Sequence, residues 1–159
     1  MGDSRRFDTF AKEIAKHFPR CYKIGDIAGG KGYLQLALRD LGFEKVTTYD
    51  TRFDSRRVKN IDYRYQLFDN AVKEEFNLLV GMHPDEGTDQ IIVNASRRHI
   101  PFMVVPCCIK PSAVQYWGSH KTKLWFEHLI SLAYASGTKS VQVLKLPING
   151  KNTVLFGKN

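Results

Sequence analysis

Apolar residues recur every three or four positions in four segments of the chain, which is the spacing of amphipathic helices. The first segment is Phe7–Phe18, and Pro19 ends it. The other three predicted helices are Tyr33–Leu41, Thr88–His99 and Lys121–Ala135. All four patterns place apolar side chains on one face, so each helix is expected to cover a larger apolar surface.

Short runs of β-branched, aromatic and other apolar residues lie between these helices and predict strands. The predicted strands are Tyr22–Ile27, Lys45–Asp50, Ile61–Phe68, Asn77–Met82, Pro101–Cys107, Ser140–Leu146 and Thr153–Phe156. The alternation of strands with connections long enough for helices favours a mostly parallel sheet covered on both faces. Only PINGKN separates the last two strands, which is too short for a parallel crossover. We therefore predict an α/β three-layer sandwich whose seven-stranded sheet ends in an antiparallel hairpin, with Asn149-Gly150 near its tip.

Composition narrows the class of protein further. The chain has 159 residues, 43% hydrophobic and 25% charged, which fits one globular domain over residues 1–159 and excludes collagen-like and disordered classes. No apolar stretch approaches the length of a membrane span, and the start MGDSRRFDTF lacks the apolar region of a signal peptide. Three cysteines, two of them adjacent, give no disulfide framework. We expect a cytoplasmic protein without membrane association.

A glycine-rich turn follows the first predicted strand, in the order Asp26-Ile27-Ala28-Gly29-Gly30-Lys31-Gly32. Glycines let the backbone approach a ligand, and the helix that follows offers free N–H groups. The next strand ends in Asp50, where a carboxylate can accept both hydroxyl groups of a ribose. The spacing is neither G-x-G-x-x-G nor a P-loop, which disfavours NAD and nucleoside triphosphates. A tight turn with no ligand is the alternative.

These motifs resemble those of S-adenosylmethionine-dependent methyltransferases of the seven-stranded, Rossmann-like type. DIAGGKGYL resembles their glycine-rich first motif, with Ala28 in place of its first glycine, and TYD resembles the acidic end of their second strand. The closing hairpin resembles their reversed seventh strand. The resemblance covers nearly the whole chain and implies methyl transfer with S-adenosyl-L-methionine as cofactor.

The resemblance also implies which residues bind the cofactor: Asp26, Ala28, Gly29, Gly30, Gly32, Tyr33, Asp50, Thr51, Arg52, Phe68, Asp69, Met82 and His83. By this likeness Asp26 lies near the amino group of the methionine part, and Asp50 holds the ribose hydroxyls. Thr51–Arg52 flank the adenosine, Phe68–Asp69 lie by the adenine, and Met82–His83 face the transferred methyl.

The segment after the fourth strand, Gly81–Asp89, and the later Pro106-Cys107-Cys108 resemble one branch of these enzymes, which includes a tRNA ribose methyltransferase. Asp85-Glu86 replace the Cys-Gly that is frequent in that branch, so its substrate does not carry over to this chain. His83 and Asp85 are the candidate catalytic residues, because histidine titrates in the range needed to take a proton from an attacking oxygen or nitrogen. For His83 the alternative is a role in packing or capping. For Asp85 it is a helix cap or a solvated acid.

The two adjacent cysteines admit a reactive pair or, with His83, part of a metal site. Successive side chains on a strand point to opposite faces, which opposes joint binding of an ion. We therefore predict buried, unreactive thiols at Cys107 and Cys108, and no metal site.

The formal net charge of +8 permits an anionic partner. Cations cluster after the second strand, at Arg52, Arg56, Arg57, Lys59 and Arg64. Cations and aromatic rings mix before the last long helix, at Tyr116, Trp117, His120, Lys121 and Lys123. Solvated faces and core aromatic residues are the alternative for each cluster. Such mixtures can bind phosphates and stack bases, so RNA is the expected substrate, entering between His83–Asp89 and Lys110–Lys123. Methylation of a protein side chain or a small molecule is one alternative. A non-catalytic binding protein is another, and an oligomer or a protein partner is also compatible with the small size.

Overall fold

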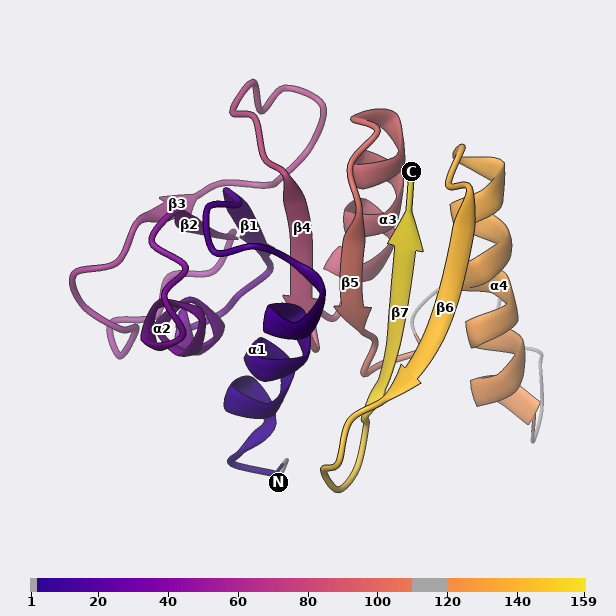
Figure 1. The fold of residues 1–159 in the computed structure, drawn as a ribbon, viewed down its shortest axis with the longest axis horizontal. Helices are drawn as coiled ribbons and strands as arrows, with labels where there is room; N and C mark the ends of the chain where they lie inside the picture. Colours follow the sequence, from indigo (N-terminus) through magenta and orange to yellow (C-terminus); the bar gives the residue numbers. More distant parts are fainter. Residues whose placement is uncertain (1–2, 110–119) are drawn as a thin grey trace.

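The computed structural model describes residues 3–109 and 120–159. Tyr116, Trp117 and most of the predicted substrate-reading segment therefore lie outside the described residues. Seven strands form one sheet: β1 (Ile24–Ile27), β2 (Val46–Asp50), β3 (Tyr63–Tyr65), β4 (Leu78–Met82), β5 (Phe102–Val105), β6 (Ser140–Lys145) and β7 (Thr153–Lys158). Their order across the sheet is β3-β2-β1-β4-β5-β7-β6 (Figure 1).

The predicted direction of the last strand is confirmed. Strand β1 is parallel to β2 and β4, and the parallel pairs β2–β3 and β4–β5 extend the sheet on either side. Strand β7 is antiparallel to both of its neighbours, β5 and β6. The hairpin register pairs Lys145 with Thr153, and Gly150 at its tip has φ 83°, which glycine adopts without strain.

Helices cover both faces, as predicted. Helices α1 (Arg6–His17) and α2 (Tyr33–Asp40) pack on one face, and α3 (Gly87–Arg97) and α4 (Lys121–Ala135) pack on the other. Figure 1 shows α1 crossing in front of the sheet and α3 behind β5. The strands supply both cores by alternation: Leu78 and Val80 pack with α1 and α2, whereas Leu79 packs with α3 and α4.

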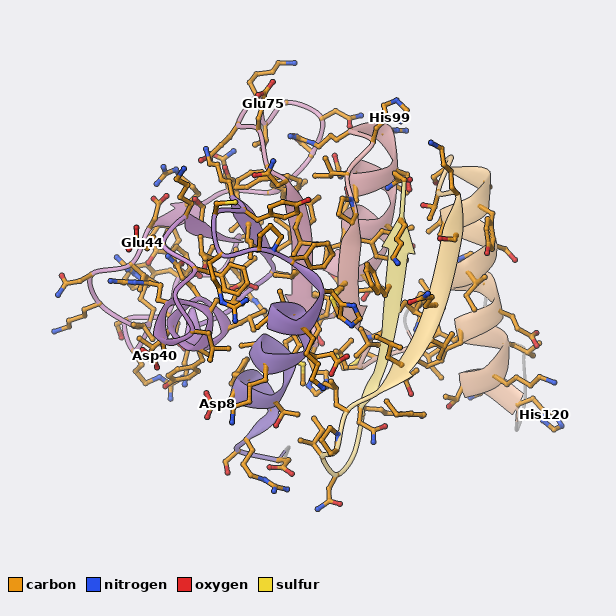
Figure 2. The ribbon with its side chains drawn as sticks, in the orientation of Figure 1. Asp8, Asp40, Glu44, Glu75, His99 and His120 are labelled. Carbon is orange, nitrogen blue, oxygen red and sulfur yellow. The ribbon has the colours of Figure 1, made fainter. Side chains whose placement is uncertain are left out.

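Several charged or titratable side chains lie at the periphery of this three-layer structure (Figure 2). Those labelled there are all exposed: Asp8, Asp40, Glu44, Glu75, His99 and His120. Among the described residues, no helix is long and apolar enough to cross a membrane.

Strand β3 differs most from its prediction, since it covers Tyr63–Tyr65 and not Ile61–Phe68. It is an edge strand, and the described segments 51–62 and 66–77 on either side contain no helix that would cover it. Tyr65 and Leu67 are accordingly exposed, whereas Phe68 turns inward to the second core. The alternation of apolar and polar residues therefore overestimated the length of this strand. The strand ends three residues before Phe68, the residue predicted to contact the adenine.

Candidate cofactor-binding site

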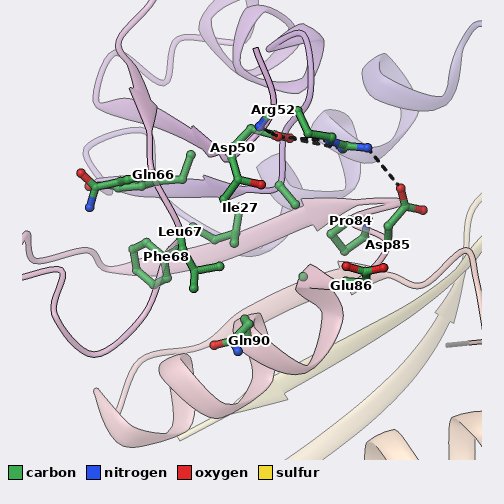
Figure 3. A pocket seen from close by; sticks show the side chains of 14 residues that line it. Ile27, Asp50, Arg52, Gln66, Leu67, Phe68, Pro84, Asp85, Glu86 and Gln90 are labelled. Carbon is green, nitrogen blue, oxygen red and sulfur yellow. Dashed lines mark hydrogen bonds and ion pairs between the residues drawn. The ribbon is translucent and has the colours of Figure 1, made fainter. Parts of the chain in front are cut away.

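A cavity of about 460 Å³ opens at the carboxyl ends of β1, β2 and β4, beside the first turn of α3 (Figure 3). Its volume lies within the usual range of small-molecule sites. Its position is the switch point of the sheet, where the chain leaves β1 toward one side and β4 toward the other. The lining residues are Ile27, Ala28, Tyr49, Asp50, Thr51, Arg52, Gln66, Leu67, Phe68, Pro84, Asp85, Glu86, Gly87 and Gln90.

The glycine turn packs tightly against the strands below it. A Cβ atom on Gly29 would lie 2.2 Å from Oδ2 of Asp26, so no larger residue fits there. Ala28 adopts φ 53°, a left-handed conformation that is strained for alanine. Its methyl group faces the start of α3, where a Cβ on Gly87 would come within 2.9 Å of it. The turn and the helix therefore approach each other closely only because residue 87 has no side chain.

Asp50 organises the floor of the cavity. The residue is nearly buried, at 4% exposure, and each carboxylate oxygen accepts one backbone hydrogen bond. Oδ2 accepts from the Gly30 N–H at 2.8 Å, and Oδ1 accepts from the Arg52 N–H at 2.8 Å. An ionised carboxylate has about four acceptor positions, so these two bonds leave two for further donors.

The Arg52 guanidinium fills those two positions in this structure. It lies 3.2 Å from Oδ1 and 3.3 Å from Oδ2 of Asp50, and its Nη1 is 3.6 Å from Asp85 (Figure 3). The Arg52 side chain is 64% exposed. An ion pair with such an exposed partner contributes little to stability, because water and salt screen it. The guanidinium can therefore leave Asp50 at small cost when a ligand arrives.

Asp26 lies beneath the turn and does not line the cavity. It is fully buried, its Oδ2 accepts a 3.1 Å hydrogen bond from Thr48, and its Oδ1 has no hydrogen-bond partner among the described residues. Burial raises the pKa of Asp26 to about 7, and the neighbouring Asp50 charge acts in the same direction. A buried carboxyl with an unpartnered oxygen under a ligand-sized cavity suits a cationic group above it.

Phe68 closes the far wall of the cavity. Its ring packs edge-on against Tyr49, at 5.0 Å between centroids, and the Arg98 guanidinium lies 4.9 Å from its centroid. Asp69, in contrast, turns away and accepts a hydrogen bond from the Ala71 N–H. The neighbouring Gln66 and Leu67 line the cavity, whereas Asp69 does not.

The residues at and after the end of β4 also separate into two groups. Asp85 lines the cavity, whereas Met82 is buried in the core beside α1 and α2. His83 points toward the β6–β7 hairpin, where its Nε2 lies 2.9 Å from the Lys151 carbonyl oxygen. Since a carbonyl only accepts, Nε2 carries the hydrogen and Nδ1 remains the basic nitrogen. Partial burial lowers the pKa of His83, which keeps the ring neutral at neutral pH.

The structure thus brings together part of the implied cofactor set around one cavity. The lining members are Ala28, Asp50, Thr51, Arg52 and Phe68, and the candidate catalytic Asp85 joins them. Tyr33 lies elsewhere, with its ring 5.6 Å from that of Phe7 in α1. Sequence reasoning missed Ile27, Tyr49, Gln66, Leu67, Pro84, Glu86, Gly87 and Gln90. The available signal was positional, because helix N-termini that follow parallel strands face the ligand edge of such sheets.

The prediction that Cys107 and Cys108 are buried and point to opposite sides is wrong. Their sulfur atoms lie 3.5 Å apart, both side chains are partly exposed, and both lie beside Asp85. The physical reason is that β5 ends at Val105. Side-chain alternation holds only within a strand, so it no longer applies beyond Pro106.

The chain is similar to known proteins in its fold but matches none of the compared families or curated proteins by sequence. No protein-family model matches the sequence, and no curated protein matches it either. The fold is similar to that of the ribosomal protein L11 methylase from Lactobacillus delbrueckii subsp. bulgaricus, with a TM-score of 0.61 over 100% of this chain and 80% of that one, at 16% identity.

Two further solved structures are similar to the same extent. The methyltransferase CalO1 of calicheamicin biosynthesis, in an SAH-bound form, has a TM-score of 0.59 at 19% identity, over 98% of this chain and 53% of that one. A SAM-dependent methyltransferase from Aquifex aeolicus has a TM-score of 0.58 at 11% identity, covering 98% and 93%. The chain therefore has the Rossmann-like fold of SAM-dependent methyltransferases.

Proposed function

We propose that the protein binds S-adenosyl-L-methionine in the Ala28–Asp50 cavity and transfers its methyl group to an acceptor. The observation that carries this proposal is the placement of Asp50, a nearly buried carboxylate at the end of β2 whose two remaining acceptor positions are held only by an exposed arginine. Two adjacent ribose hydroxyls are the donors that fit this arrangement. The fold shared with SAM-dependent methyltransferases supports the same assignment.

The chain's own residues have distinct tasks in this proposal. Asp50 keeps its two backbone hydrogen bonds and exchanges the Arg52 guanidinium for the ribose hydroxyls. Phe68 and Leu67 offer apolar surface to the adenine ring. Asp26 lies beneath the turn, and a cationic amino group bound above it would favour the ionised form of its carboxyl, whose Oδ1 has no hydrogen-bond partner among the described residues. The bound sulfonium supplies an activated methyl group, so positioning of the acceptor carries much of the rate.

His83 is the proposed proton acceptor for an oxygen or nitrogen nucleophile. Its Nε2–H is anchored on the hairpin carbonyl of Lys151, which leaves Nδ1 as the basic atom, and its lowered pKa keeps that atom unprotonated. Asp85, on the cavity wall between Arg52 and the two cysteines, is proposed to orient the acceptor.

The cofactor assignment is tested by calorimetric titration with S-adenosylmethionine, S-adenosylhomocysteine and NAD in parallel. Asp50→Ala removes a charge-assisted contact to the ribose and should weaken binding by roughly 1.5–3 kcal/mol, about 10- to 150-fold. Arg52→Ala is the matched control, because it removes the competing guanidinium and should leave affinity unchanged or raise it. Equal affinity of the folded Asp50→Ala protein, or preference for NAD, would contradict the assignment.

RNA is the proposed acceptor. The support is the net charge of +8 and a rim near the cavity where aromatic rings and a cation gather. Arg57 lies 5.2 Å from the Tyr63 ring centroid and 5.5 Å from that of Tyr65, and Phe53 beside Tyr65 is 76% exposed. Exposed rings beside an arginine are suited to stacking unpaired bases.

A salt series of RNA affinity tests this acceptor. Each phosphate contact should contribute about −0.7 to the log–log slope on a single strand, so Lys121→Glu with Lys123→Glu should flatten it. Phe53→Ala should weaken binding by roughly 1–3 kcal/mol if the ring stacks on a base. Affinity that is undetectable or independent of salt would move the proposal to a protein or small-molecule acceptor, whereas cofactor titrations would be unaffected.

A further inference from the structure

Three potential metal ligands meet where β4 and β5 end, and one of them, Asp85, also lines the cofactor cavity. The Cys107 and Cys108 sulfurs lie 3.0 Å and 3.5 Å from Oδ1 of Asp85, and 3.5 Å from each other. Within the described part of the chain, this is the group of three or more such residues whose ligand atoms all approach within 4.8 Å. All three side chains are partly exposed, so an ion could reach them from solvent.

The triangle formed by these atoms is close to one face of a zinc coordination tetrahedron. Zn–S and Zn–O bonds of about 2.3 Å and 2.1 Å place two sulfurs about 3.8 Å apart and a sulfur and an oxygen about 3.6 Å apart. The observed separations are shorter by tenths of an ångström, as expected for protonated thiols that donate to the carboxylate. An ion at the centre requires only that the three atoms spread slightly.

The fold explains why residues so far apart in sequence meet here. Strands β4 and β5 are parallel neighbours whose register pairs Met82 with Val105, so the loops that follow leave the same edge of the sheet. Asp85 has φ 48°, a left-handed conformation that reverses the loop toward β5. Pro106 ends the strand pairing, and the two cysteines then present their sulfurs on one side. Strained backbone of this kind often accompanies functional sites.

The local charge is also compatible with a divalent ion. Two thiolates and one carboxylate carry three negative charges, which a divalent ion reduces to one. The Arg52 guanidinium, 3.6 Å from Asp85, offsets that remaining charge. Burial and the neighbouring carboxylate raise the pKa of the Cys107 thiol to about 12, so metal binding must displace its proton. A bound cation favours the thiolate over the protonated thiol, because it deprotonates a thiol that coordinates it.

We propose that Asp85, Cys107 and Cys108 form a zinc-type metal site at the rim of the cofactor cavity. Thiolate ligands favour zinc among the common divalent ions, and three protein ligands leave a fourth position for water or for an atom of the acceptor. The ion would join the loops after β4 and β5 next to the proposed acceptor entrance. This proposal does not depend on cofactor binding, because none of the three ligands needs the cofactor in order to meet.

Cobalt titration of the full chain tests the site. The protein is reduced, freed of metal with a chelator and titrated with Co²⁺, which gives a sulfur-to-cobalt charge-transfer band and intense visible bands in tetrahedral thiolate sites. We expect one equivalent to bind and Zn²⁺ to displace it. Cys107→Ser and Cys108→Ser should each abolish or strongly reduce the charge-transfer band, and Asp85→Asn should weaken binding at least about tenfold.

Cys21→Ser is the matched control, because Cys21 is an exposed cysteine on another part of the molecule. It should bind cobalt as the wild type does. The absence of the band in folded, reduced wild-type protein at saturating Co²⁺ would overturn the proposal without reference to any variant. A band that survives both Cys107→Ser and Cys108→Ser, or that disappears in Cys21→Ser, would overturn it as well. Far-ultraviolet circular dichroism establishes that each variant is folded.

Discussion

The buried carboxyl of Asp26 should make the stability of the fold depend on pH in a defined way. In the folded chain its pKa is about 7, whereas an exposed aspartate titrates near 3.8. Below pH 3.8 the group is protonated in both states, so it does not oppose folding. As the pH rises from 3.8 to 7, only the unfolded chain loses the proton, and the free energy of unfolding falls. Above pH 7 the loss is complete.

The size of this effect follows from the same two values. At about 1.4 kcal/mol per pKa unit, their difference corresponds to a total of about 4 kcal/mol. About 3 kcal/mol of it should be lost between roughly pH 5 and pH 8, because part of the change already occurs at lower pH. This is a large fraction of the stability of an ordinary domain. Asp26 is fully buried, so solvent screening does not reduce the figure.

Denaturant unfolding of the wild type and of Asp26→Asn at a series of pH values measures this loss of unfolding free energy. Asparagine is nearly the same size and does not titrate, so histidines and surface acids contribute equally to both proteins. The wild type should lose about 3 kcal/mol relative to Asp26→Asn between about pH 5 and pH 8. Parallel stability curves for the two proteins, within about 0.5 kcal/mol, would refute the argument that burial controls this carboxyl.

Two further predictions concern the cavity. Gly87→Ala places a Cβ 2.9 Å from that of Ala28, so it should destabilise the fold by about 1–3 kcal/mol and weaken cofactor binding. Ala28→Gly in the same chain should restore both, and a double-mutant cycle with no coupling would contradict the contact. His83→Gln should lower kcat and remove the acid limb of the pH–rate profile, which in the wild type should lie below pH 6.5 because burial lowers the pKa of His83. An unchanged profile would exclude the proton-accepting role.

The periodicity of apolar residues was sufficient to predict the fold, because the apolar face of each helix and the apolar strands it covers indicate the same arrangement. The four amphipathic helices each bury one face, and the short link before Thr153–Lys158 allows only a hairpin. The length of the edge strand β3 was overestimated, because a pattern of alternating apolar and polar residues does not reveal whether a helix covers the strand. The position of Asp50 was predictable, because the second strand lies parallel beside the first and both end at the same edge of the sheet, next to the glycine turn.

The finer geometry of the site depended on contacts that no local pattern contains. The Arg52 side chain reaches back to Asp50 over two residues, and nothing in the sequence distinguishes this from an arginine extended into solvent. The approach of Ala28 to Gly87 joins positions on different elements. The meeting of Cys107 and Cys108 with Asp85 required knowing that β5 ends before Pro106, and strand boundaries are the least certain part of a sequence-based prediction.

Because β7 lies between β5 and β6, the sheet cannot be completed in the order in which its strands are synthesised. Strand β6 leaves the ribosome before β7, yet within the described residues its strand partner is β7 alone. A nascent chain that has emerged only through Lys145 therefore has β5 as an open edge and β6 with nowhere to dock. Both strands must wait for the segment that ends at Lys158, whose insertion between them completes the sheet in one late event. Until then the apolar row Phe102–Val105 lies at an unpaired strand edge, where a nascent chain is prone to aggregate.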